Sequence, residues 1–278
     1  MNEDVRLNAY FERIGFAGSI APTLPTLEAL HALQPAAIPF ENISSLVGTP
    51  VPLDAPSLNQ KLLVERRGGY CFELNLMFLR ILRELGFDAR GHLASVLWSG
   101  RPVDELVPDH MLITVDVGGT TYLADVGFGG LLLVAPLKLR TGIEQETALG
   151  NYRVTGEGPR LRLEFKHHGE DWRPVYAFTT EDVPDARYGE INDGLNADPA
   201  WFFHHHLLVE RATPAGRHLL FDTRLTTITP GAERTILHLG TVEELRNILI
   251  TTFGIGLGAI EGLDARLEAL LARSAGAV

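Results

Sequence analysis

The hydrophobic pattern of the chain changes at Gly86, and this change limits the folds that the chain can adopt. Before Gly86, apolar residues recur at helical spacing, and we expect helices over residues 7–14, 26–34, 57–65 and 70–85. Ser57 and Gln60 form a capping-box pattern in the third of these segments. The fourth is apolar on nearly all sides and ends before a glycine, as expected of a buried central helix.

After Gly86, apolar residues alternate with polar ones, and β-branched residues become common. This pattern predicts an antiparallel sheet or small barrel with strands over residues 89–98, 111–117, 120–126, 131–139 and 160–165. Residues 185–203 have a loop-like composition, and a further strand pair is expected over 207–211 and 218–223. Near the C-terminus, Thr241 and Glu244 form a capping box, and residues 263–272 are amphipathic. The order indicates an α+β fold.

Composition excludes several classes of protein. The 278 residues include 24 Lys and Arg and 35 Asp and Glu, and a net charge of -11 disfavours nucleic acid as a partner. The longest uncharged stretches, residues 14–27 and 247–260, are too short for a membrane-spanning helix, which needs about 20 apolar residues. The first residues show no secretion signal, so we expect a cytoplasmic location. Composition leaves the oligomeric state open, including a homo-oligomer.

Cys71 is the single cysteine, which rules out intrachain disulfides and metal sites built from several cysteines. It follows Gly68 and Gly69 and begins the predicted central helix. Free N–H groups and the positive end of the helix dipole favour a thiolate at such a position. Cys71 is therefore a candidate nucleophile, with a buried, unreactive cysteine as the alternative.

A cysteine nucleophile in acyl transfer needs a base and a third group that orients the base. A two-residue turn at residues 118–119 would place Asp125 opposite Leu112, and hence diagonally across from His110 on the same face. This register predicts a His–Asp pair. The alternative is a solvated strand edge, and a three-residue turn would move Asp125 to the other face.

Four segments of the chain agree in order and spacing with the motifs of a known family: Pro39–Asn42 (PFEN), Arg67–Asn75 (RGGYCFELN), His110, and Asp125–Gly129 (DVGFG). Together they resemble the arylamine N-acetyltransferases, over about the first half of the chain. The resemblance implies an N-terminal helical bundle, a central antiparallel β-barrel and a C-terminal α/β lid around a core like that of cysteine proteases. We place these parts at residues 1–86, 87–190 and 191–278.

The resemblance also implies a catalytic triad of Cys71, His110 and Asp125 and a ping-pong reaction. Acetyl-CoA would acetylate the cysteine, and an arylamine, arylhydroxylamine or hydrazine would then accept the acetyl group. Acetyl-CoA is thus expected as a co-substrate, with no tightly bound cofactor and no metal. Segment 198–203 departs from the family pattern, which weakens the resemblance in the C-terminal part.

Two sets of binding residues follow. By position, the aromatic acceptor would contact Phe40, Val96, Phe128 and Phe203, for which core packing is the alternative. The glycine-rich segment after Asp125 would let CoA approach the backbone at Gly127 and Gly129.

Three other functions are compatible with the same residues. One is a hydrolase with the same triad and water as the acceptor, and another is an amide synthase of the same family that uses a biosynthetic acyl chain. The third is a metal-binding or structural protein that uses His204, His205 and His206 with His167 and His168. The natural acceptor and the preferred acyl chain are left open.

Overall fold

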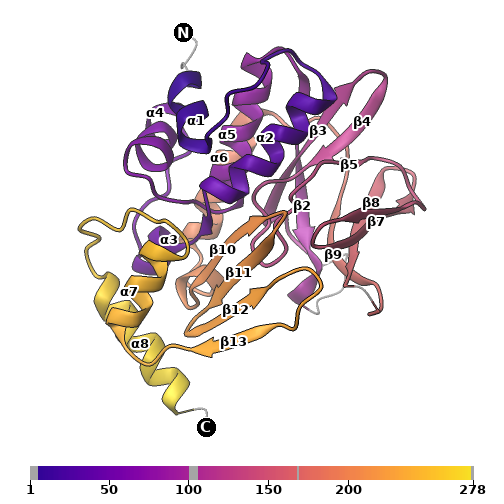
Figure 1. Cartoon of the computed structure of the whole chain (residues 1–278). Helices are drawn as coiled ribbons and strands as arrows, with labels where there is room; N and C mark the ends of the chain where they lie inside the picture. The colour runs from indigo at the N-terminus through magenta and orange to yellow at the C-terminus, as the bar shows by residue number, and fades with distance from the viewer. Residues whose placement is uncertain (1–5, 100–105, 168, 277–278) are drawn as a thin grey trace.

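The computed structural model describes residues 6–99, 106–167 and 169–276. Its N-terminal helices are α1 (Leu7–Ile14), α2 (Leu24–Ala37), α3 (Ile43–Val47), α4 (Ala55–Leu58) and α5 (Cys71–Glu84). The prediction of a buried central helix is confirmed, because α5 is buried along almost its whole length. It packs against strands β2 (Asp88–Val96) and β3 (His110–Val117) (Figure 1). Gly86 follows α5 with φ at +82°, a conformation that favours glycine at a helix end.

The third predicted helix differs from the expectation at both ends. It begins at Ala55, and residues 59–64 continue it as a π-helix. The predicted capping box of Ser57 and Gln60 is wrong. Asp54 caps the helix instead, because its Oδ1 accepts a hydrogen bond of 2.9 Å from the backbone N–H of Ser57.

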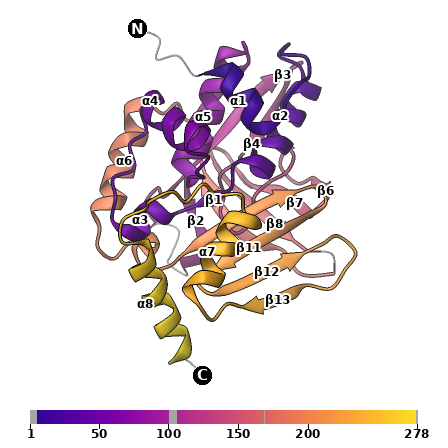
Figure 2. The ribbon, with the colours of Figure 1, turned by 60° about the vertical axis from the view of Figure 1, so that its left-hand side comes forward.

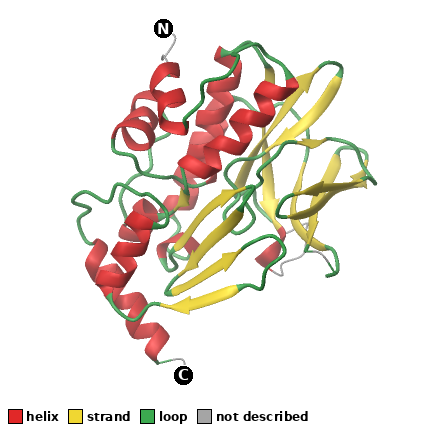
Figure 3. Cartoon of the chain, in the orientation of Figure 1, coloured by secondary structure: helices red, strands yellow, loops and turns green. Residues whose placement is uncertain are grey.

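The central part is a nearly closed barrel of eight antiparallel strands. They are β2 (Asp88–Val96), β3 (His110–Val117), β4 (Thr120–Ala124), β5 (Leu137–Lys138), β6 (Glu144–Thr147), β7 (Gly150–Glu157), β8 (Arg160–Lys166) and β9 (Arg173–Phe178). They lie in the order β5-β4-β3-β2-β9-β8-β7-β6. Leu112, Leu123, Tyr152 and Tyr176 belong to the separate hydrophobic core inside this barrel. The barrel and the N-terminal helices together confirm the predicted α+β class (Figure 3).

The prediction of a strand over residues 131–139 is mostly wrong, since only Leu137–Lys138 pairs with β4. Two buried side chains take the place of a strand partner. Glu210 accepts hydrogen bonds from the backbone N–H groups of Gly130 and Leu132, and Arg217 donates to the carbonyl oxygens of the same two residues. We call this arrangement the Glu210–Arg217 clamp. It satisfies the backbone of the loop without a sheet.

The C-terminal part contains a second antiparallel sheet flanked by two helices. The strands are β10 (Leu208–Thr213), β11 (Gly216–Phe221), β12 (Arg224–Ile228) and β13 (Thr235–His238), and the helices are α7 (Val242–Thr251) and α8 (Leu263–Ala275). The short N-terminal strand β1 (Phe40–Glu41) pairs with β10 and completes the sheet (Figure 2). The capping box of Thr241 and Glu244 at the start of α7 is confirmed. The division at residues 86 and 190 stays a prediction.

Residues 185–203 are not a loop throughout, because Asp185–Ala197 forms helix α6. Its composition is polar and it contains two glycines, so no apolar helical period shows in the sequence. Tertiary contacts stabilise it instead: Tyr188 and Asn192 are buried, and the Asn192 side chain donates a hydrogen bond of 3.0 Å to the carbonyl oxygen of Val51. None of the described helices is long and apolar enough to cross a membrane.

Replacing Arg217 with methionine should lower the free energy of unfolding by about 3 to 5 kcal/mol, because the buried Glu210 carboxylate would lose its counter-charge. In the clamp the Arg217 Nε lies 2.8 Å from Glu210 Oε1. Urea denaturation at pH 7 measures the loss. As a control, Arg153→Met removes a partly exposed ion pair with Glu164 and should cost about 1 kcal/mol or less. Equal losses would show that the clamp stabilises the fold no more than a surface pair.

Candidate active site

The loop before α5 fixes the position of Cys71. The Gly69 N–H donates to the carbonyl oxygen of Pro39 at 3.3 Å, and the Gly69 carbonyl accepts from the N–H of Glu41 at 2.9 Å. A Cβ atom on Gly68 would lie 2.2 Å from the Pro39 carbonyl oxygen, so a side chain at this position would collide with the backbone. The Pro39–Asn42 and Arg67–Asn75 segments therefore contact each other, and this contact fixes the position of the start of α5.

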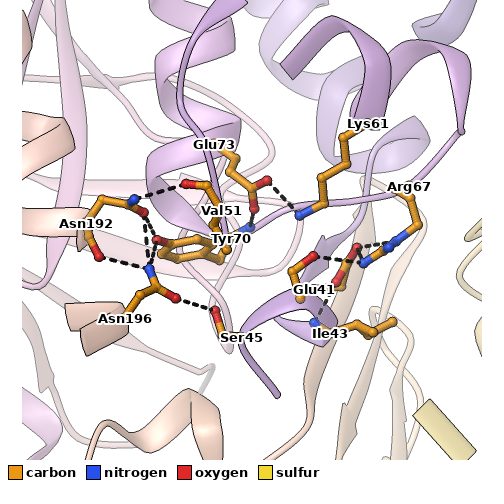
Figure 4. A network of polar contacts seen from close by, with 11 residues as sticks. Glu41, Ile43, Ser45, Val51, Lys61, Arg67, Tyr70, Glu73, Asn192 and Asn196 are labelled. Atoms are coloured by element: carbon orange, nitrogen blue, oxygen red, sulfur yellow. Dashed lines mark hydrogen bonds and ion pairs between the residues drawn. The ribbon is translucent and has the colours of Figure 1, made fainter. Parts of the chain in front are cut away.

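Two ion pairs flank this loop (Figure 4). Arg67 contacts the buried Glu41 at 2.7 Å, and Lys61 contacts Glu73 at 2.6 Å. Glu73 also accepts a hydrogen bond of 3.0 Å from the backbone N–H of Tyr70. The charge of Arg67 is thus already balanced by the Glu41 carboxylate. Arg67 therefore stabilises the loop before α5 and does not pair with the Cys71 thiol.

His110 and Asp125 form the predicted pair. Strands β3 and β4 pair in the register expected from the two-residue turn, and Asp125 directly follows β4. His110 Nε2 lies 2.7 Å from Asp125 Oδ2, and both side chains are almost wholly buried. The register prediction is confirmed, and the His110 ring is oriented by a carboxylate.

Asn75 connects this pair to the helix that carries Cys71. Its Nδ2 donates to Asp125 Oδ1 at 2.9 Å and to the Met111 carbonyl at 2.6 Å, while its Oδ1 accepts from the N–H of Val126 at 3.0 Å. No role for Asn75 is predicted from the sequence. The available signal was its spacing, because residues four apart on a helix share a face, which puts Asn75 on the face of Cys71.

The surroundings of Asp125 keep its carboxylate ionised. Burial raises the pKa of Asp125, but His110, Asn75 and the backbone N–H of Gly127 together bring that pKa below its ordinary value. A buried carboxylate with these donors can stabilise a proton on the imidazole without being protonated itself.

The environment of Cys71 differs from the expectation. Burial raises the pKa of the thiol well above its ordinary value, and the carboxylates of Asp109 and Asp125 raise it further. The backbone N–H groups of Phe72 and Met111 act in the opposite direction but do not prevail. The helix start thus acts on the thiol in the predicted direction, but it does not set the pKa of Cys71. A base that takes the proton would favour ionisation of Cys71, and the His110 imidazole lines the same cavity.

Cys71 and His110 line one cavity of about 280 Å³. All six residues expected to bind substrate or CoA also line it: Phe40, Val96, Gly127, Phe128, Gly129 and Phe203. The sequence reasoning missed five further residues of the wall: Trp98, Asp109, Trp201, Phe202 and Leu208. Three of these belong to residues 201–208, which only the tertiary fold brings to the helix start. The cavity is mainly aromatic and suits a flat apolar ligand.

Gly127 and Gly129 have a packing role that the sequence did not reveal. A Cβ atom on Gly127 would lie 3.0 Å from the Cα of Cys71, and one on Gly129 would lie 2.5 Å from the ring of Phe40. Close approach of these segments therefore already requires glycine. Contact of either glycine with CoA stays a prediction.

Three histidines of the third alternative, His204, His205 and His206, have separate partners. His204 contacts the carbonyl oxygens of Ser45 and Asn196, His205 that of Pro199, and His206 the carboxylate of Asp222. Within the described part of the chain, no group of three or more His, Cys, Asp or Glu side chains could hold a metal ion. His168 lies outside the described residues.

His31 of α2 contacts the backbone of Asp125. Its Nε2 accepts a hydrogen bond of 3.1 Å from the backbone N–H of Asp125, which requires an unprotonated Nε2. Burial lowers the pKa of His31 to about 4, although the Asp125 charge acts in the opposite direction. This neutral histidine was also missed from the sequence.

Comparison with known proteins gave consistent matches. A family model described as N-acetyltransferase matches residues 23–261. The arylamine N-acetyltransferase / N-hydroxyarylamine O-acetyltransferase of Salmonella typhimurium is 38% identical over 269 residues, which cover 96% of this chain and 95% of that protein.

Solved structures match over the same length. The arylamine N-acetyltransferase of M. smegmatis has a TM-score of 0.90 at 35% identity and covers 96% of this chain and 99% of its own. The enzyme of Mycobacterium marinum in complex with CoA has a TM-score of 0.89 at 32% identity, with coverage of 95% and 99%.

His110→Asn should slow the alkylation of Cys71 by iodoacetamide at pH 7 by about a hundredfold, because the buried thiol would lose the base that takes its proton. The rate for this variant should rise steadily with pH above 7, since the pKa of the isolated thiol is raised. Intact-mass spectrometry follows the labelling. His206→Asn, outside the cavity, should label like the wild type. Equal rates in His110→Asn and the wild type would show that His110 does not take the proton.

His31 predicts a pH dependence of stability. Its pKa is about 4 in the folded protein and about 6.5 when unfolded, so its contribution is complete above pH 6.5 and is lost as the pH falls towards 4. Between pH 7.5 and 5.0 the wild type should lose about 2 kcal/mol that His31→Gln does not lose. Urea denaturation of both proteins at the two pH values measures this difference. Parallel losses would contradict a buried neutral His31.

Proposed function

Because the chain belongs to the arylamine N-acetyltransferase family, we propose that it transfers an acetyl group from acetyl-CoA to arylamines, arylhydroxylamines or hydrazines through a thioester on Cys71. The observation that carries the proposal is the shared cavity of Cys71 and His110, with His110 held 2.7 Å from Asp125. Acetyl-CoA is a co-substrate in this proposal rather than a resident cofactor.

In the first half-reaction the Cys71 sulfur attacks the thioester carbonyl. His110 takes the thiol proton, the new bond between Sγ and the acetyl carbon forms, and the bond between that carbon and the CoA sulfur breaks. The proton then passes from His110 to the departing CoA sulfur. Since Nε2 faces Asp125, the other ring nitrogen, Nδ1, is the one that exchanges the proton.

In the second half-reaction the acceptor amine attacks the acetyl carbon. The bond from nitrogen to carbon forms, the bond from carbon to Sγ breaks, and His110 carries a proton from the amine to the sulfur. The backbone N–H of Cys71, at the start of α5, would donate to the oxyanion in both steps. Asp125 stabilises the imidazolium form throughout.

The lining of the cavity affects whether water or an amine attacks the acetyl group on Cys71. Phe40, Phe128, Trp201 and Phe203 give the cavity that Cys71 lines an apolar surface, which would shelter an acetyl-enzyme and offer stacking partners to an aromatic acceptor. This favours amine transfer over the hydrolase alternative. A volume of about 280 Å³ suits a small acyl group and one ring better than the long chain of an amide synthase. Contact of CoA with Gly127 and Gly129, a cytoplasmic location and a homo-oligomer stay predictions.

Mixing the protein with acetyl-CoA should add one acetyl group to the intact mass, and Cys71→Ala should gain none. Addition of an aromatic amine such as 4-anisidine should remove the group from the wild type and yield the acetylated amine. An acetyl-enzyme that decays at the same rate with and without the amine would support the hydrolase instead. Acetylation of Cys71→Ala would contradict the assignment of the nucleophile.

A further inference from the structure

One wall of the aromatic cavity carries a charge that the proposed reaction does not use. Asp109 lines the cavity beside Cys71 and His110, and among the described residues of the lining it is the one carboxylate. The remaining wall is formed by aromatic and aliphatic side chains and by the backbone of two glycines. A single acidic residue therefore borders the space that an acceptor would occupy.

Two hydrogen bonds fix the position of Asp109, one to its side chain and one to its backbone. Its Oδ1 accepts a hydrogen bond of 2.8 Å from the backbone N–H of Val96, another residue of the wall. Its backbone carbonyl oxygen accepts from the Cys71 thiol, with 3.8 Å between sulfur and oxygen. Asp109 is thus held between strand β2 and the reacting sulfur.

The negative charges of Asp125 and Asp109 near the sulfur are balanced by different numbers of hydrogen-bond donors. Asp125 has His110, the Asn75 amide and the Gly127 N–H around its oxygens. Asp109 has the Val96 N–H, and burial raises its pKa although this bond and the charge of His110 oppose the rise. The charge of Asp109 also reaches the sulfur, since it raises the pKa of Cys71. Its field is therefore felt where the acceptor must bind.

We propose that Asp109 is a specificity-determining residue, which makes the cavity select neutral or cationic aromatic amines and hydrazines against amines that carry a carboxylate. Two like charges enclosed by aromatic walls repel more strongly than in water, because the surroundings screen them less. A repulsive group that leaves neutral ligands unaffected is an effective way to discriminate between ligands of one shape. The inference rests on the proposed function, because it names the acceptor class of that site.

The test compares 4-aminobenzoate with 4-aminobenzamide, which has nearly the same shape but no charge. The acetyl-enzyme is formed first with acetyl-CoA, and the second-order rate of deacetylation by each amine is measured at pH 7.5. The wild type should favour the benzamide by at least about tenfold beyond the ratio of the uncatalysed reactions, which corresponds to about 1.4 kcal/mol. Asp109→Asn, which keeps an acceptor for the Val96 N–H, should reduce this preference about tenfold.

A matched control is Asp116→Asn, which removes a partly exposed carboxylate at the other end of strand β3 and should leave the preference within twofold of the wild type. If Asp109→Asn does not fold, Asp109→Ser retains a hydroxyl acceptor and should give the same loss of preference. The inference is overturned if a folded Asp109 variant keeps the wild-type preference for the benzamide. It is also overturned if Asp116→Asn loses that preference to the same extent.

A second measurement separates this inference from the proposed function. The affinities of the two amines for the unacetylated protein can be followed by quenching of the fluorescence of Trp98 and Trp201, both in the cavity wall. Tighter binding of the benzamide that depends on Asp109 would support the inference even if no acetyl-enzyme forms, which would contradict only the proposed function. Equal affinities in the wild type and Asp109→Asn would count against the inference alone.

Discussion

The buried carboxylate of Asp125 sets the arrangement of the site. A fully buried carboxylate must receive hydrogen bonds from the protein, and here His110, Asn75 and Gly127 supply them. These donors come from strand β3, helix α5 and the loop after β4. Because each element must present a donor to the same two oxygens, the position of α5, and with it Cys71, is tied to that of His110. Reactivity and packing are therefore determined by the same contacts.

The parts of the site that were predictable from the sequence are those fixed by local geometry. The two-glycine turn at residues 118–119 determined the register of His110 and Asp125, since side chains alternate in strands. The loop at 131–139 was not predictable in this way, because Glu210 and Arg217 complete its hydrogen bonds from about 80 residues away. Helix α6 was missed for a related reason: its buried side includes Asn192, which bonds to the backbone of another segment.

The electrostatics of Cys71 shows a second limit of reasoning from local sequence. A helix start offers partial positive charge, but the pKa of a thiol also depends on how much water it loses and on the charges packed around it. Burial and the carboxylates of Asp109 and Asp125 outweigh the N–H groups of α5. Asp109 adjoins His110 in the sequence, yet only its place in the cavity reveals its influence on the sulfur.

The two halves of the chain contribute differently to the cavity. The motifs of the first half bring the sulfur, the imidazole and two close-packed glycines together. A Cβ atom at Gly68 would collide with the backbone, and one at Gly127 would crowd the Asn75 side chain and the backbone of Cys71. These positions therefore have little freedom to vary without displacing Cys71. Trp201, Phe203 and Leu208 come from the second half, where the resemblance to the family motifs is weaker, and they line the same cavity. The part of the lining that the second half contributes is therefore less constrained by the contacts that hold the sulfur and the imidazole.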